Sequence, residues 1–242
     1  MPFSSSIKWF TCFIFLFAIL AVFQSYRRSS STPDDITSPI AKTSNQEESA
    51  LKGYGRAGNF HYYVLSLSWS PGFCAQQGNH QEHKQCRTSA GFVLHGLWPQ
   101  NRKGYPSNCS HPIQNPSAND LALTGRAFPD TSLARYQWRK HGSCSGLPPK
   151  EYFAASLHAY DLIRIPLLLT ERPFTSPLTT QQIRQAFTNS NPNLKSHMFA
   201  LICKRGILQE IRICLDKSLT AFRRCEEDVR DQCGSAPVII QP

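Results

Sequence analysis

The stretch GFVLHGLW, Gly91 to Trp98, is apolar for most of its length and is closed by Pro99. A short apolar run between a glycine and a proline is typical of a buried β-strand. One histidine, His95, stands near its end, where the strand gives way to a loop. A lone histidine on an apolar strand is more often a hydrogen-bonded core residue than a functional one. The role of His95 therefore depends on what the rest of the chain brings to it.

Other stretches predict strands and helices in no regular alternation. FHYYVLSLSWS (60–70) is rich in aromatic and β-branched residues and predicts a strand, and two further strands are expected in 197–206 and 207–216, turning at Gly206. Helices are expected in LARYQWRKHG (133–142), in KEYFAASLHAYDLIRI (150–165) and in TTQQIRQAF (179–187). This mixture predicts the α+β fold class.

The segment YQWRKHGSC (136–144) carries a second histidine beside a lysine. On a helix, Gln137, Lys140 and His141 would share one face, because residues three and four apart are neighbours. A histidine has an ordinary pKa of about 6.5 and can both take and give a proton. The lysine adds a fixed positive charge. Together they suit a reaction in which a proton moves while negative charge grows on a phosphate.

Length and charge set the broad class. A chain of 242 residues suits one domain with a sizeable core. The formal charge is +10, and all of the excess lies in residues 51–242, which hold 22 Lys/Arg and 12 Asp/Glu. A basic domain suits an anionic partner such as nucleic acid, but charge alone does not decide this.

Eight of the nine cysteines are spread along the predicted domain; Cys12 lies apart in an apolar N-terminal run. The eight are Cys74, Cys86, Cys109, Cys144, Cys203, Cys214, Cys225 and Cys233. An even set of this kind predicts four disulfides and an oxidising compartment. A zinc site in HQEHKQC (80–86) is the competing interpretation, but it lacks the repeated CxxC pairs of structural zinc sites, so no metal is expected.

The N-terminus indicates export. Trp9 to Phe23 form a largely apolar run of fifteen residues, which matches a signal-peptide core and is short of the about twenty residues of a membrane span. Residues 1–26 are expected to be a signal peptide or an uncleaved signal anchor, and the polar residues 27–57 a disordered linker. The protein would be secreted, periplasmic or in another oxidising compartment, and membrane-anchored if residues 1–26 are retained.

FVLHGLWP and WRKHGSC resemble the two active-site signatures of the ribonuclease T2 family, in that order, with 46 positions between His95 and His141. YYVLSLSWSPGFC, GYPSNC and CKRGILQEIRICLD resemble further segments of the same family. The resemblance implies a catalytic domain over residues 58–234, with a central antiparallel sheet flanked by helices, followed by a tail at 235–242. It also implies the pairing of the cysteines: Cys74–Cys86, Cys109–Cys144, Cys203–Cys233 and Cys214–Cys225.

The resemblance also implies a reaction. His141 would take the proton of the ribose 2′-hydroxyl, His95 would protonate the departing 5′-oxygen, and Lys140 would stabilise the charged phosphorus. The product would be a 2′,3′-cyclic phosphate that water opens later. RNA would be the substrate, with low base specificity, and DNA would not react because it lacks the nucleophile. No cofactor, metal or obligatory protein partner is implied, and a monomer is expected.

Trp98 and Tyr105 match positions that stack on a base. For Trp98, ordinary packing is an equally good interpretation, because a tryptophan can do both. Trp138 is expected in the core.

Two positions depart from the family, whose second signature begins His-Glu-Trp where this chain has Tyr136, Gln137 and Trp138. Tyr136 can still donate a hydrogen bond to phosphate. Gln137, counted here among the candidate catalytic residues, keeps the shape of glutamate without its charge or its titratable proton, so reduced activity and a lower pKa for His141 are expected. The alternative is a catalytically weakened RNA-binding or signalling protein on the same fold. A secreted binding module without enzymatic role would leave the Lys-His pair unexplained.

Overall fold

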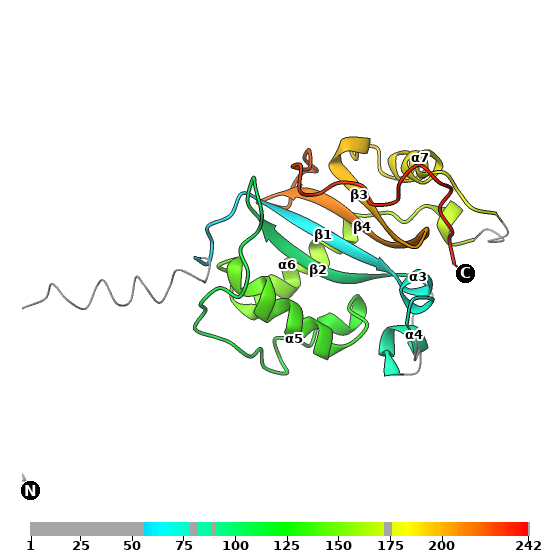
Figure 1. Cartoon of the computed structure of the whole chain (residues 1–242). Coiled ribbons are helices and arrows are strands. Elements are labelled where there is room, and N and C mark those ends of the chain that lie inside the picture. The colour runs from blue at the N-terminus through cyan, green and yellow to red at the C-terminus, as the bar shows by residue number, and fades with distance from the viewer. Residues whose placement is uncertain (1–55, 78–81, 89–90, 172–175, 242) are drawn as a thin grey trace, which may run out of the picture. The chain divides into compact units, whose positions relative to one another are not determined.

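The computed structural model describes residues 56–77, 82–88, 91–171 and 176–241. Its four strands form one antiparallel sheet in the order β2-β1-β4-β3 (Figure 1). The strands are β1 (Tyr62–Trp69), β2 (Phe92–Gln100), β3 (Phe199–Lys204) and β4 (Ile207–Asp216). The helices are α3 (Ser70–Cys74), α4 (Lys84–Thr88), α5 (Thr131–Lys140), α6 (Pro149–Asp161) and α7 (Thr180–Ser190). Single 3₁₀ turns occur at Thr124–Arg126, Gly142–Cys144, Leu167–Leu169 and Ser196–Met198. The predicted α+β domain with an antiparallel sheet is confirmed.

Strand β1 lies inside the sheet, and all eight of its residues are buried. Its two faces differ in character. Tyr63, Leu65, Leu67 and Trp69 belong to the main core, which the helices also line. The alternate residues on the other face end in two serines, Ser66 and Ser68, which are small and buried. The second face of the sheet therefore has room above β1 for side chains that come from the neighbouring strands.

Helices α5 and α6 lie beside β2, and α7 lies at the β3 side of the sheet (Figure 1). The hydroxyl of Tyr152 on α6 donates a hydrogen bond of 2.9 Å to the carbonyl oxygen of Leu97 on β2. Trp138 on α5 is fully buried against this pair of elements, as predicted. A Cβ atom at Gly142 would lie 2.7 Å from both the Trp138 and Tyr152 rings, so only glycine allows this approach. The end of α5 is thus fixed against β2.

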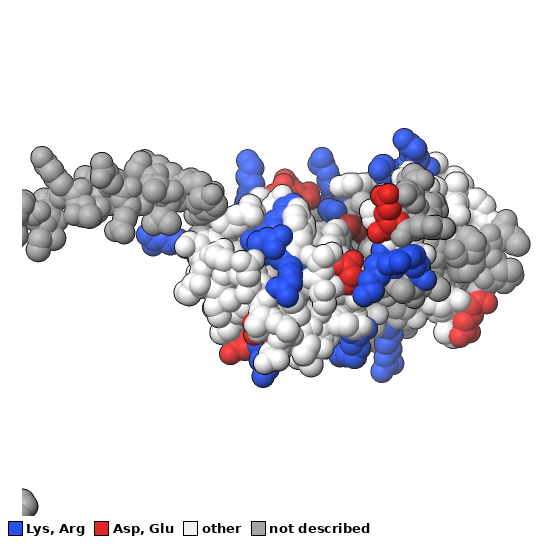
Figure 2. All heavy atoms as spheres, turned by 90° about the horizontal axis from the view of Figure 1, so that it is seen from below, with Lys and Arg blue, Asp and Glu red and all other residues white. Residues whose placement is uncertain are grey.

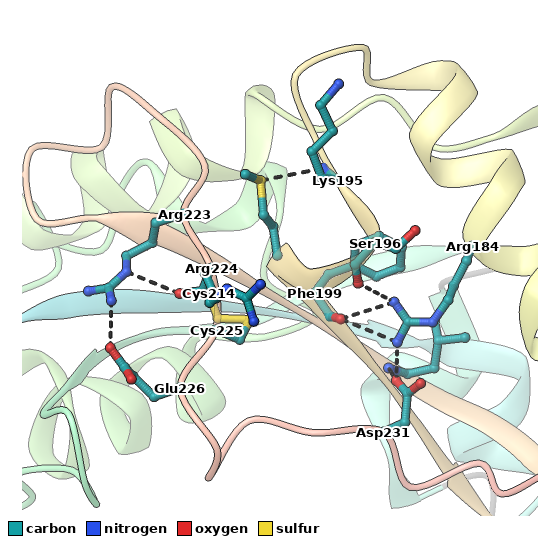
Figure 3. The surroundings of a disulfide bond; sticks show 12 residues. Arg184, Lys195, Ser196, Phe199, Cys214, Arg223, Arg224, Cys225, Glu226 and Asp231 are labelled. Carbon is teal, nitrogen blue, oxygen red and sulfur yellow. Dashed lines mark hydrogen bonds and ion pairs between the residues drawn. A yellow bond between two sulfur atoms is a disulfide. The ribbon is translucent and has the colours of Figure 1, made fainter.

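The four implied disulfides are confirmed, with Cys74–Cys86, Cys109–Cys144, Cys203–Cys233 and Cys214–Cys225 all bonded. Figure 3 shows the last of these, flanked by the ion pair of Arg223 with Glu226 (2.6 Å) and by that of Arg184 with Asp231.

A zinc site in residues 80–86 would lack its thiolate ligand, because Cys86 is bonded to Cys74. His80 lies outside the described residues. Within the described ranges no group of three His, Cys, Asp or Glu side chains could hold a metal ion.

The last described residues, expected as a tail, are part of the folded unit. Val238 and Ile240 are buried in the main core. The backbone of Leu178 exchanges hydrogen bonds with that of Val238, and the Leu208 amide donates to the Ile239 carbonyl at 3.1 Å. At the other end, the expected signal segment and nearly all of the linker 27–57 lie outside the described residues. No helix in the described part of the chain is long and apolar enough to cross a membrane.

Candidate active site

His95 sits at a β-bulge in β2. Ser66 of β1 pairs with Gly96 and Leu67 pairs with Leu94, so His95 is the extra residue without a partner. In a regular strand His95 and Trp98, three positions apart, would point to opposite faces. The bulge changes this, because it adds one residue to β2 and re-aims the side chain. The two rings instead lie on the same side of the sheet, with centroids 5.3 Å apart.

The imidazole of His95 reaches across β1 to a carboxylate on β4. Its Nδ1 lies 2.5 Å from Oε1 of Glu210. Strand β1 lies between these two strands, and the residues that face the gap there are Ser66 and Ser68, which leave room for the contact. The second carboxylate oxygen, Oε2, accepts from Nε and Nη2 of Arg212 at 3.0 and 2.9 Å. A linked row of side chains, His95, Glu210 and Arg212, therefore crosses the open face of the sheet.

The charge of Glu210 is stabilised by its two partners. Burial on its own would raise the pKa of this carboxyl group, but the hydrogen bond and charge of His95 and the guanidinium of Arg212 outweigh it and lower the pKa to about 2. Glu210 is therefore ionised at any pH at which the protein is expected to work.

His141 comes to the same place from α5. The helix ends at Lys140, and His141 is its C-cap, with its amide still bonded to the Gln137 carbonyl at 2.9 Å. The residue is only 6% exposed. Its ring stacks on Trp98 with centroids 5.1 Å apart and lies 5.7 Å from the Tyr105 ring. The two histidines, distant in the chain, thus both contact one tryptophan.

The imidazole of His141 is neutral over a wide pH range. Burial above all, and then the charges of Lys140 and His95, lower its pKa to about 3. This is the direction predicted for a site without a carboxylate at position 137, with burial as the largest cause. The Nδ1 atom of His141 is buried and has no hydrogen-bond partner in the described structure, which leaves Nε2 for exchange with a ligand.

Gln137 has a definite structural role. It is 1% exposed, and its Oε1 accepts a hydrogen bond of 2.8 Å from the indole Nε1 of Trp98. A Cβ atom at Gly96 would collide with both of these atoms, so the glycine in the bulge is required for the pair to form. Gln137 thereby fixes the indole that both histidines contact.

These residues line one cavity of about 640 Å³. Its walls include His95, Trp98, Gln100, Tyr105, Tyr136, Gln137, Lys140, His141 and Arg212. The sequence therefore predicted which distant segments meet here. Among its aromatic side chains, Tyr105 and Tyr136 are the exposed ones, at 53% and 46%. The Nζ atom of Lys140 lies 5.6 Å from the centre of the Tyr136 ring, and no carboxylate of the described residues forms an ion pair with it.

A second cavity, of about 710 Å³, adjoins the first at His95 and Tyr136. Its lining includes Ser68, Phe73, Gln85, Pro129, Leu133 and Glu210. The shared histidine and tyrosine stand between two spaces, each large enough for a small planar group.

Basic side chains are frequent on one face of the molecule, and charges of both signs line the first cavity. Figure 2 shows Lys and Arg side chains spread over one face of the molecule, with fewer Asp and Glu among them. Within the first cavity, Lys140 and Arg212 bring positive charge, that of Arg212 being paired with Glu210, and Asp228 brings one negative charge.

Glu210 and Arg212 were not among the residues predicted from the sequence. The signal that could have found them is the stretch QEIRIC, where Glu210 and Arg212 alternate with the fully buried Ile211 and Ile213. Charged residues on a strand inside a sheet are unusual unless they are paired.

Comparisons with known proteins concern the family and the fold. The sequence model of the Ribonuclease T2 family matches residues 60–225. A "Ribonuclease" of Aeromonas hydrophila is 31% identical over 204 residues, covering 80% of this chain and 91% of the relative. Two solved structures share the fold at a TM-score of 0.60: an RNase-related protein from Calystegia sepium (23% identity, 75% of this chain and 97% of that one) and ribonuclease MC1 from bitter gourd seeds (19%, 74% and 100%).

Proposed function

Because the chain belongs to the ribonuclease T2 family, we propose that it cleaves single-stranded RNA internally, without a metal ion, through a 2′,3′-cyclic phosphate. The observation that carries the proposal is the convergence of His95, Lys140 and His141 on one cavity. Two proton carriers beside a free cation are what an in-line displacement at a phosphodiester needs.

The first step uses His141 as the base and His95 as the acid. Neutral His141 takes the proton of the ribose 2′-hydroxyl at Nε2, and the 2′-oxygen forms a bond to phosphorus. The bond from phosphorus to the 5′-oxygen breaks, and His95 gives that oxygen a proton. Lys140 stabilises the charge that builds on the phosphoryl oxygens. In the second step the roles reverse and water opens the cyclic phosphate. DNA is not cleaved, because it has no 2′-hydroxyl.

The aromatic residues hold the nucleotide. Tyr105 is exposed at the rim and suits stacking on a base, a contact worth about 1–3 kcal/mol with little base preference. Trp98 combines this with packing, since His141 and the Arg212 guanidinium lie against its ring. Tyr136 lines both cavities and donates to the phosphate between two nucleotides. Gln137 is placed to hold Trp98, and its lack of charge lowers turnover relative to a glutamate.

The four disulfides fit an oxidising compartment. We propose that residues 1–26 direct export as a signal peptide or an anchor, that 27–57 are a linker, and that the domain from 58 onward acts as a monomer without an obligatory partner.

The test is cleavage of one RNA and of the DNA of the same sequence, both single-stranded, in excess chelator. RNA should be cut with cyclic-phosphate ends, and DNA should stay intact. His95→Ala and His141→Ala should each slow cleavage at least about a hundredfold, while His61→Ala, an exposed histidine outside the cavity, should not. Activity that disappears in chelator and returns with a divalent ion would contradict the mechanism.

The second candidate is an RNA-binding protein of weakened activity. Tyr136 and Gln137, which stand where the family has His and Glu, favour it. Tight RNA binding without cleavage in the same assay would establish it.

A further inference from the structure

We propose that Glu210 is the positioning residue of His95, and that it determines which ring nitrogen exchanges protons with the substrate. This inference rests on the proposed function, because it concerns the acid of that reaction.

The carboxylate of Glu210 is held from both sides. One oxygen lies 2.5 Å from Nδ1 of His95 and the other accepts two hydrogen bonds from Arg212. The Glu210 side chain is 13% exposed, whereas that of His95 is 31% exposed. A buried carboxylate fixed by a guanidinium has little freedom to turn, so it presents a constant acceptor to the more accessible ring.

The consequence for His95 is a fixed tautomer. An ionised carboxylate can only accept hydrogen bonds, so the proton shared with Glu210 belongs to Nδ1. When the ring is protonated, the second proton lies on Nε2. Transfer breaks this N–H bond and forms the O–H bond of the leaving 5′-hydroxyl, and the neutral ring keeps its proton on Nδ1. In the hydrolysis step the lone pair of Nε2 takes a proton from water, which restores the starting state.

Without the carboxylate this order is lost. An imidazole that has no partner can place its single proton on Nε2, and the ring is then unable to accept a proton from water at that atom. In the first step the protonated ring also loses the charge of the carboxylate and the fixed orientation that direct its Nε2–H at the leaving 5′-oxygen. A carboxylate behind a histidine prevents this in other acid–base sites, where loss of its charge lowers turnover by orders of magnitude. The bulge at His95 and the small Ser66 and Ser68 are the features of the sheet that let Glu210 reach the ring.

The kinetic test compares two esters of the same nucleoside. Uridylyl-3′,5′-adenosine releases an alkoxide that needs a proton, whereas uridine 3′-(4-nitrophenyl phosphate) releases a nitrophenolate that does not. Glu210→Ala should lower kcat on the dinucleotide about a hundredfold with KM within about threefold, and should lower kcat on the nitrophenyl ester by no more than about threefold. Glu210→Asp should recover part of the loss.

The matched control is Asp231→Asn, which removes an ion-paired carboxylate outside both cavities. An equal loss on both esters, or no loss, would overturn the proposal.

The second measurement does not depend on activity. Long-range ¹H–¹⁵N correlations of the histidine rings report which nitrogen of neutral His95 carries the proton. We expect Nδ1–H in the wild type and Nε2–H in Glu210→Ala. The reverse in the wild type, or an unchanged tautomer in the variant, would contradict the inference. Glu210→Gln, which preserves the shape, takes the place of Glu210→Ala if the latter does not fold. A wild type that cleaves neither ester would refute the proposed function, and the tautomer would still decide the positioning role.

Discussion

At the scale of single residues, His141 shows how burial prepares a base. Its ring is covered by Trp98 and Tyr105 and lies next to the positive charge of Lys140. Burial and that charge both disfavour the imidazolium, and together they lower the pKa to about 3. The residue that the proposed mechanism needs in its neutral form is therefore neutral before substrate arrives. The neutral Gln137 adds no negative charge that would offset the charge of Lys140 and so raise the pKa of His141.

The same low pKa predicts how stability depends on pH. The unfolded chain has an ordinary histidine of pKa 6.5, whereas folded His141 titrates near 3. Between these values the unfolded state binds a proton that the folded state does not. The free energy of unfolding should therefore fall as the pH falls through this window, by about 1.4 kcal/mol for each tenfold difference in proton affinity and by up to roughly 5 kcal/mol in all.

His141→Asn removes this titration and should flatten the fall in stability between pH 6.5 and 3. The measurement is the urea midpoint as a function of pH for both proteins. Protonation of Glu210, whose pKa is also depressed, lowers the free energy of unfolding in part of this range, but it does so equally in both proteins. His61→Asn, at an exposed position, is the control and should leave the curve unchanged. Parallel curves for the wild type and His141→Asn would mean that His141 is not buried as a neutral ring.

At the scale of elements, the bulge in β2 is the device that assembles the site. It places His95 and Trp98 on one face while Leu94 and Leu97 both stay in the core. Gly96 then leaves space for the hydrogen bond between Trp98 and Gln137. The extra residue in β2 thus allows the hydrogen bond by which Trp98 of the sheet contacts Gln137 near the end of α5.

Gly96→Ala should disrupt this connection. The added Cβ would collide with the Trp98 indole nitrogen and the Gln137 side-chain oxygen. We expect a loss of about 1–3 kcal/mol in the free energy of unfolding, as for other overpacked sites, together with a lower kcat. Both are measured at a temperature at which the variant is folded. Gly125→Ala adds the same atom where nothing lies within 4 Å and serves as control. Equal behaviour of the two variants would contradict the proposed role of the bulge.

The elements were predictable from the sequence because their signals are local, whereas the assignment of His95 to the site came from the resemblance. Apolar runs predicted the strands, and the spacing of Gln137, Lys140 and His141 predicted a shared site. The bulge was not predictable, since one extra residue leaves no mark in a run as apolar as GFVLHGLW. Glu210 was missed because its partner lies 115 positions away. The disulfide pairs came from the resemblance alone, because eight cysteines allow 105 connectivities.

At the scale of the whole molecule, the disulfides divide into those that hold the site and those that hold the rest of the fold. Cys109–Cys144 joins the loop after β2 to the turn that follows His141, and the Asn108 amide donates to the Lys140 carbonyl at 2.9 Å beside it. Cys203–Cys233 instead starts on β3, at the opposite edge of the sheet from β2, and neither of its cysteines lines either cavity. Both bridges restrict the unfolded chain, but only the first restrains the position of catalytic groups.

Removing each bridge in turn should therefore lower stability in both variants but lower activity in only one of them. The first closes a separation of 35 positions and the second one of 30, so chain entropy predicts a loss of about 4 kcal/mol for each when both cysteines of a pair become serine. At a temperature where both variants are folded, Cys109→Ser with Cys144→Ser should lower kcat at least about tenfold, since small misplacements of catalytic groups are costly. Cys203→Ser with Cys233→Ser should keep kcat within about twofold. The measurements are urea unfolding and initial rates on one dinucleotide. If both pairs lower kcat equally, the end of α5 is held by its packing against Trp138 and Tyr152, and the bridge beside it contributes stability alone.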